Sequence, residues 1–159
     1  MLLHKSVIHD SRVRREASAL AACGYRVTVV ELAPDAAGTL DGFARRSASP
    51  PAAWRDRLPR SLYRLAFVAR FVQEARRLRP DVVHVHDAAM LVPGLIATRL
   101  TGARLVYDSH ELATGVAYRD ALFGGFVAAI EWLGMRRASV VITVSDGIAD
   151  ALQDRYGLR

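Results

Sequence analysis

Two stretches decide the fold: Val82-Val83-His84-Val85-His86-Asp87 and Leu105-Val106-Tyr107-Asp108-Ser109-His110-Glu111. Each is a run of β-branched and apolar residues that ends abruptly in ionisable side chains. Such runs are typical of strands that are buried on both faces of a parallel sheet. In an open α/β sheet, ligands bind outside the carboxyl ends of the strands, which is where both polar clusters are expected. We therefore predict a site at this edge of the sheet.

The distribution of histidine favours the same site. The chain has five histidines, and each lies in a predicted strand or in a loop at a strand end: His4, His9, His84, His86 and His110. None lies in a predicted helix. A site at one sheet edge explains this pattern better than histidines scattered for packing.

The composition indicates one globular domain. A chain of 159 residues, with 52% hydrophobic and 24% charged residues, is long enough for a single core. The formal charge of +6, mostly from arginine, favours nucleic acid, anionic lipid or a phosphorylated ligand as possible partners. A single cysteine excludes a disulfide within the chain. No signal peptide is recognisable, and no run approaches the roughly 20 apolar residues of a membrane span, so we expect a cytoplasmic protein.

Strand and helix patterns alternate along the chain, which predicts an α/β fold with a parallel sheet and right-handed crossovers. The first strand has only residues 1–3 available, so it is a stub or its natural start lies upstream. The remaining elements are a helix at 11–22, a strand at 26–32, a helix at 61–78, a strand at 82–86, a helix at 88–100, a strand at 104–107, a loop at 108–118, a helix at 119–137, a strand at 140–144 and a helix from Ser145 to Tyr156.

The segment 33–59 differs from the rest of the chain. It is rich in Ala, Ser, Pro, Gly and Arg and has few large apolar residues. Its length is unusual for a connection inside a compact domain. We expect it to be a mobile insertion.

Several stretches resemble one family, the retaining GT-B glycosyltransferases of family 4. The resemblance is carried by residues 10–17, 24–30, 80–87, 105–112 and 138–145, in this order and with this spacing. It covers nearly the whole chain and points to the N-terminal, acceptor-side domain of such an enzyme. The first loop, His4 to His9, departs from the family's Gly-rich turn, which argues against a donor-phosphate contact there.

The resemblance implies a Rossmann-like parallel sheet with helices on both faces, a single domain over 1–159 that is half of a GT-B fold. Such a domain holds a glycan or lipid-linked acceptor, while a C-terminal domain that this chain lacks holds most of the nucleotide-sugar donor. The transfer retains configuration without a covalent protein nucleophile. No cofactor, no metal and no nucleic-acid partner are implied, and we expect the chain to be inactive alone.

By resemblance, His110 is the catalytic candidate, because its counterpart lies in the cleft near the transferred sugar. An imidazole can donate and accept hydrogen bonds near neutral pH. The alternative is a strand-end histidine bonded to backbone. Asp108 and Glu111 flank His110. Either could orient its ring or bond to the loop backbone, and the alternative is that both are solvent-exposed loop acids.

Other candidates line the expected acceptor pocket. His86 and Asp87 could bind acceptor hydroxyls, although Asp87 could also cap the following helix. His84 shares the strand face of His86 and is expected to be a buried, satisfied histidine. A metal site formed by His84, His86, Asp87 and His110 is an alternative, which is disfavoured because the resemblance implies no metal.

Three further residues are predicted at helix starts. Asp10 and Arg12 lie at the first strand-to-helix turn, where an arginine could meet a phosphate. An ordinary surface arginine is the alternative for Arg12. Ser145 is expected to cap the last helix and, secondarily, to contact ligand.

The stretch from Trp54 to Leu65 interleaves aromatic residues with arginine. This pattern suits a peripheral contact with an anionic membrane, at the inner face in a cytoplasmic protein. A solvated basic face on an amphipathic helix is the alternative.

Two other functions compete with glycosyl transfer. A non-catalytic sugar- or partner-binding module would show the same motifs without activity. A generic nucleotide-binding domain is disfavoured because no G-x-G-x-x-G follows a strand.

Overall fold

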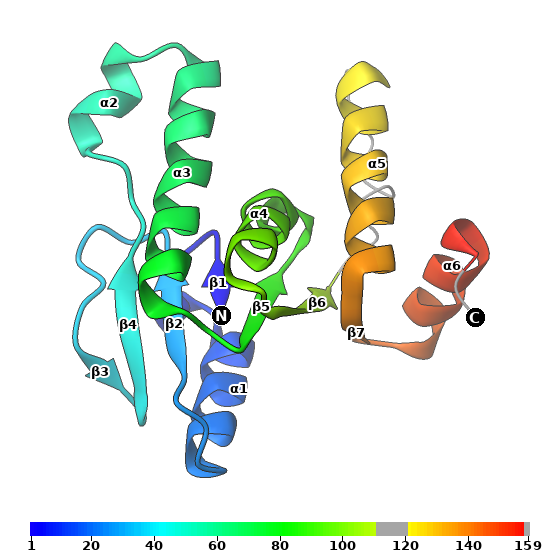
Figure 1. The fold of residues 1–159 in the computed structure, drawn as a ribbon, viewed down its shortest axis with the longest axis horizontal. Helices are drawn as coiled ribbons and strands as arrows, with labels where there is room; N and C mark the ends of the chain where they lie inside the picture. Colours follow the sequence, from blue (N-terminus) through cyan, green and yellow to red (C-terminus); the bar gives the residue numbers. More distant parts are fainter. Residues whose placement is uncertain (111–120, 158–159) are drawn as a thin grey trace. The chain divides into compact units, whose positions relative to one another are not determined.

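The computed structural model describes residues 1–110 and 121–157 (Figure 1). The chain forms two compact units, Met1–Pro80 and Asp81–Arg159, called here the N-terminal and C-terminal units. Both units consist of a predominantly parallel sheet with helices packed on it, which confirms the predicted α/β class. Each unit is described by itself.

The N-terminal unit contains a sheet with the strand order β3-β4-β2-β1. β1 pairs with β2 and β2 with β4 in parallel, whereas β3 runs antiparallel to β4. Its elements are β1 (Leu2–Leu3), a 3-10 turn η1 (Val7–His9), α1 (Ser11–Ala22), β2 (Thr28–Glu31), β3 (Thr39–Leu40), β4 (Phe43–Ser47), α2 (Ala52–Arg57) and α3 (Arg60–Leu78). The short first strand and the bounds of α1 agree with the sequence analysis.

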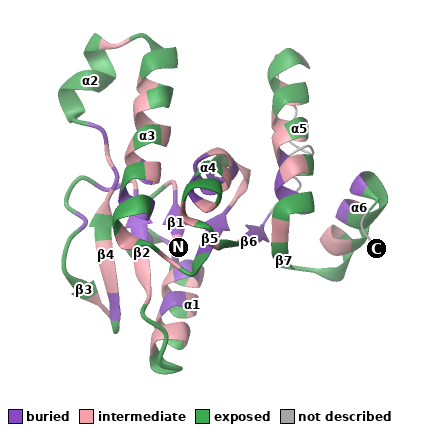
Figure 2. Ribbon diagram, in the orientation of Figure 1, coloured by how far each residue is buried: buried purple, intermediate pink, exposed green. Residues whose placement is uncertain are grey.

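Helices cover both faces of this sheet. On one face, Val13 and Ala17 of α1 pack with Val29 and Phe43 in a fully buried cluster. Val30 and Arg46 pair in register and therefore share the opposite face, where Arg46 lies 3.8 Å from Glu74 of α3. Figure 2 shows the buried positions in purple along the strands of this unit.

A fully buried carboxylate joins three elements of the N-terminal unit. Glu31, at the end of β2, accepts a hydrogen bond from the Val7 backbone N–H at 2.6 Å. Its other oxygen accepts from the Arg45 Nε of β4 at 2.7 Å. The ion pair between Glu31 and Arg45 is almost completely buried, since the Arg45 side chain is only 10% exposed. These bonds hold η1 and β4 against β2.

The segment 33–59 has more regular structure than the sequence analysis predicted. It contains β3, β4 and α2, and Phe43 of β4 is fully buried. The strands are joined by the two-residue turn Asp41-Gly42, both with positive φ, as a type I′ hairpin requires. An Asp-Gly pair is a strong hairpin signal, but here the flanking β3 is only two residues long. Residues 39–47 of this segment thus form a hairpin, and the expected mobility of the segment stays a prediction.

The C-terminal unit contains three parallel strands in the order β5-β6-β7. Its elements are β5 (Val82–His86), a 3-10 turn η2 (Ala88–Met90), α4 (Leu91–Thr101), β6 (Arg104–Ser109), α5 (Ala121–Arg137), β7 (Ala138–Thr143) and α6 (Asp146–Tyr156). β5 matches its predicted bounds. β6 is two residues longer than predicted, so Asp108 and Ser109 belong to the strand and not to the loop.

Pro93 and Gly94, which weakened the helix prediction, both have places in α4. Pro93 lies in the first turn, where a backbone N–H has no partner within the helix, so its missing donor costs nothing. A Cβ on Gly94 would lie 2.4 Å from Cγ1 of Val85. The glycine therefore allows α4 to pack closely on β5.

A second buried carboxylate ties the C-terminal unit together. Glu131 of α5 is fully buried and accepts hydrogen bonds from the hydroxyls of Tyr107 in β6, at 3.0 Å, and of Tyr156 in α6, at 2.7 Å. One side chain thus connects two helices and the central strand.

Within residues 1–110 and 121–157, no helix has the length and apolar character needed to cross a membrane.

Hydrogen exchange tests the strands assigned within the segment 33–59. The backbone N–H groups of Ala44, Arg45 and Ala48 donate to backbone carbonyls of the same unit, whereas α2 has no buried residue. We expect amides of Ala44, Arg45 and Ala48 to exchange at least about 100-fold more slowly than those of residues 53–57. Uniformly fast exchange over 39–57 in a mass-spectrometric time course would contradict the assigned strands.

Substitution of Glu131 tests the second carboxylate. Glu131→Ala removes the acceptor of two buried phenol hydroxyls and should lower the free energy of unfolding by about 2–5 kcal/mol. Asp150→Ala, on the exposed side of α6, is the matched control and should change it by less than about 0.5 kcal/mol. Urea unfolding measures both. Equal changes in the free energy of unfolding of the two variants would show that the buried hydrogen bonds of Glu131 do not stabilise the fold.

Candidate functional site

Four predicted site residues gather at the carboxyl ends of β5 and β6: His86, Asp87, Asp108 and His110. His86 and Asp108 are register partners in the parallel pair, so their side chains leave the sheet on the same face. Val85 and Tyr107 pair on the opposite face, where α4 and α5 pack. The alternation of the strands thus separates the polar cluster from the apolar contact with the helices.

Asp108 is the centre of this cluster. One of its oxygens, Oδ2, lies 2.6 Å from Nε2 of His110 and 3.2 Å from Nδ1 of His86. The other ring nitrogen of His110, Nδ1, lies 3.1 Å from Oδ1 of Asp87. His110 is therefore held between two carboxylates, and both of its nitrogens act as donors when the ring is protonated.

These contacts set the charge of the cluster. Burial alone would lower the pKa of His110, but the bonds to Asp108 and Asp87 outweigh it and raise the pKa to about 9. Burial would raise the pKa of Asp108, yet the two imidazoles hold that pKa well below its usual range. Burial lowers the pKa of His86 despite the nearby carboxylate. At neutral pH the cluster therefore consists of an imidazolium, two carboxylates and a neutral His86.

Asp87 adopts a costly backbone conformation. Its φ of 67° and ψ of 158° lie in a region that is essentially reserved for glycine. The backbone N–H of Asp87 donates to the Asp108 carbonyl at 3.0 Å. The Asp87 carboxylate forms an ion pair with Nδ1 of His110. The side chain makes no capping bond to the following turn, so the alternative role of Asp87 as a helix cap is wrong. Strain of this kind concentrates at functional sites.

The cluster reaches solvent mainly through Asp87. The side chain of Asp87 is 26% exposed, against 6% for His110, 4% for Asp108 and none for His86. A ligand approaching this edge therefore meets a carboxylate first, with the imidazolium behind it. Such a pair can accept a hydrogen bond from a ligand hydroxyl and donate one to a second oxygen.

The other predicted site residues lie outside this cluster. Asp10 caps α1, accepting from Val13 N at 3.2 Å, and pairs with Lys5 at 3.0 Å; Arg12 is half-buried in the first turn of α1. Both belong to the N-terminal unit. Ser145 caps α6 by accepting from Ile148 N at 3.3 Å, as predicted. Glu111 lies outside the described residues. The ligand contacts expected of these four residues stay predictions.

His84 is buried and stacks on His86, with ring centroids 4.4 Å apart. Burial, with the neighbouring His86, lowers the pKa of His84 to about 3, so its ring is neutral. His84, His86 and Asp108 offer donor atoms within 4.8 Å of one another, a spacing that a metal ion could use. The bonding oxygen of Asp108 is already occupied by two imidazoles, and we assign no metal to these residues.

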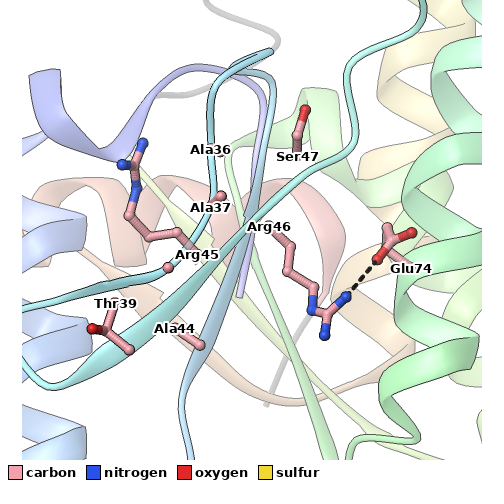
Figure 3. Close-up of a pocket in the computed structure, with 9 residues that line it drawn as sticks. Ala36, Ala37, Thr39, Ala44, Arg45, Arg46, Ser47 and Glu74 are labelled. Carbon is pink, nitrogen blue, oxygen red and sulfur yellow. Dashed lines mark ion pairs between the residues drawn. The ribbon is translucent and has the colours of Figure 1, made fainter.

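A pocket in the N-terminal unit was not predicted from the sequence. Its volume is about 510 Å³, and it lies along β4 and the segment before β3 (Figure 3). Arg46 points across it toward Glu74, and Arg45 points to the other side of the strand. The lining residues are Ala36, Ala37, Gly38, Thr39, Ala44, Arg45, Arg46, Ser47 and Glu74. It contains none of the predicted site residues, and both of its arginines pair with glutamates.

Titration of His110 tests the geometry of the cluster. We expect its ring to titrate near pH 9 in NMR spectra, while His84 stays neutral down to about pH 4. Because the folded-state pKa of His110 exceeds the unfolded value near 6.5, its stabilising effect is complete below pH 6.5 and is lost as the pH rises through 9. His110→Gln should remove this part of the pH dependence of unfolding. Titration of His110 near 6.5 would contradict the two ion pairs.

Comparison with known proteins identifies the family of this chain. The family model described as Glycosyltransferase Family 4 matches residues 11–159. No individual curated protein matches the chain. The matched range includes α1, every strand after β1 and the whole His86–Asp87–Asp108–His110 cluster. The chain therefore belongs to glycosyltransferase family 4.

Proposed function

We propose that this chain is the acceptor-binding half of a retaining glycosyltransferase that uses a nucleotide-activated sugar. The observation that carries the proposal is the placement of His110 between Asp87 and Asp108, at the carboxyl ends of two parallel strands, in a family 4 chain. His110 is the proposed catalytic residue. Most contacts to the donor's nucleotide would come from a second domain.

Substrate would enter this site at Asp87. The bond between His110 and Asp87 is 3.1 Å long and partly exposed, whereas that between His110 and Asp108 is 2.6 Å long and buried. A sugar hydroxyl could therefore replace the outer bond, donating to Asp87 and accepting from Nδ1 of His110, while Asp108 keeps the ring in place. An exposed carboxylate suits a neutral polyhydroxy ligand and repels a phosphate.

The chemical step needs no nucleophile from this chain. In the proposed reaction the acceptor oxygen bonds to the anomeric carbon on the face from which the nucleoside diphosphate leaves. The bond from the anomeric carbon to the phosphate oxygen breaks, and that oxygen takes the acceptor's proton. A rigidly held imidazolium would place a positive charge and a hydrogen-bond donor beside the reacting sugar before the reaction begins. Asp108 acts as a positioning residue through His110.

The proposal is tested on a protein in which this chain is followed by a family 4 donor domain. His110→Ala should lower kcat about 100-fold or more, because a preorganised donor is lost. His9→Ala, at an exposed position in η1, is the matched control and should leave kcat unchanged. Release of nucleoside diphosphate from a panel of nucleotide-sugars measures turnover, and circular dichroism checks the fold. Unchanged kcat in His110→Ala would refute the role of His110.

The chain without a donor domain separates the two competing functions. We expect it to transfer no sugar and to bind nucleotide-sugars weakly or undetectably. Robust transfer by the 159 residues would contradict the half-site proposal. If the two-domain protein is also inactive and the chain binds a glycan by itself, the non-catalytic binding module is the correct function.

A further inference from the structure

The tip of the helical hairpin in the N-terminal unit is poorly buried. Residues 51–70, which form α2 and the first half of α3, include no buried residue. α3 buries only Phe71, Glu74 and Ala75, all in its second half. Figure 1 shows α2 and the start of α3 beyond the ends of β2 and β4, and Figure 2 shows them exposed or intermediate. A helix of a globular protein normally buries an apolar stripe along its length.

Large apolar side chains lie on this tip. Trp54 is 43% exposed, Leu62 48% and Leu65 65%. Leu62 and Leu65 are three residues apart and therefore share a helix face. Phe71, nine residues after Leu62, points in nearly the opposite direction at 100° per residue. The two leucines thus face away from the core of their own unit.

The same tip carries an excess of positive charge. Residues 52–65 contain four arginines, Arg55, Arg57, Arg60 and Arg64, and one acid, Asp56. Arg55, Arg57 and Arg60 are exposed and form no ion pair with any residue that the structure describes. By contrast, Arg14, Arg45 and Arg77 of the same unit each pair with a carboxylate. The local charge therefore favours an anionic partner.

We propose that α2 and the first half of α3 form a docking surface for an anionic lipid bilayer. Trp54 and Leu62 would enter the headgroup region, where tryptophan is favoured at membrane interfaces. The arginines would bind lipid phosphates, with long side chains that let the charged ends reach the headgroups while the stems lie along apolar surface. The inference depends only on the N-terminal unit and does not require that the chain take part in glycosyl transfer.

Tryptophan fluorescence tests the docking. The chain has two tryptophans, so the Trp132→Phe variant leaves Trp54 as the only reporter. We expect a blue shift of Trp54 emission with vesicles of phosphatidylcholine and phosphatidylglycerol, and none with pure phosphatidylcholine. Raising the salt to about 0.5 M should weaken binding, since the screening length becomes only a few ångströms.

Charge variants localise the surface. Arg55→Gln/Arg57→Gln/Arg60→Gln should weaken partitioning to anionic vesicles by roughly 100-fold at low salt, because each arginine near such a surface contributes roughly fivefold. The matched control, Arg26→Gln/Arg99→Gln/Arg137→Gln, removes the same charge at exposed positions elsewhere and should retain most of the binding. Circular dichroism and urea unfolding verify that both variants are folded.

Several results would overturn the proposal. Equal binding to neutral and anionic vesicles, or equal loss in the two triple variants, would show that this tip does not select anionic lipid. Absence of a blue shift in Trp132→Phe at low salt would show that Trp54 does not enter the bilayer. Binding of a short DNA duplex that depends on Arg55, Arg57 and Arg60, without vesicle binding, would make the tip a polyanion site instead.

Discussion

A carboxylate that is taken out of water must find hydrogen-bond donors, and both units are organised by this constraint. Glu31 meets it with a backbone N–H and an arginine, Glu131 with two phenol hydroxyls, and Asp108 with two imidazoles. In the first two cases the donors come from separate elements, so satisfying the carboxylate also fixes the packing of helices and strands. Removing one member would leave a buried polar group without its partner, which costs more than the bond itself contributes.

Asp108 differs from the two glutamates in what its donors do. Glu131 is bonded to two phenol hydroxyls, whereas Asp108 stabilises a charged ring at the edge of the sheet. A second carboxylate, that of Asp87, contacts the same ring from the solvent side. Asp87 adopts for this a backbone conformation that favours glycine. The result is an imidazolium ring held between a buried carboxylate and a partly exposed one. This arrangement places a polar, charged cluster at the carboxyl ends of β5 and β6.

Glycosyl transfer and membrane docking are proposed for different units and depend on different physics. The cluster at the end of β5 and β6 depends on short hydrogen bonds in a nearly dry environment, which salt screens weakly. The α2–α3 tip depends on exposed arginines whose attraction for a surface falls within a Debye length. Conditions that abolish one property should therefore leave the other intact.

The sequence by itself determined the strands and helices with strong periodicity, the cap at Ser145, and the meeting of His86, Asp87, Asp108 and His110 at one sheet edge. These features follow from local rules: apolar runs define strands, and parallel strands place their carboxyl ends together. Only the tertiary structure decided that Asp87 bonds to His110 instead of capping a helix, that β4 joins the sheet, and that Glu131 holds Tyr107 and Tyr156. Each of these depends on partners far apart in the chain or on a backbone angle that its residue type disfavours, and no local pattern encodes either.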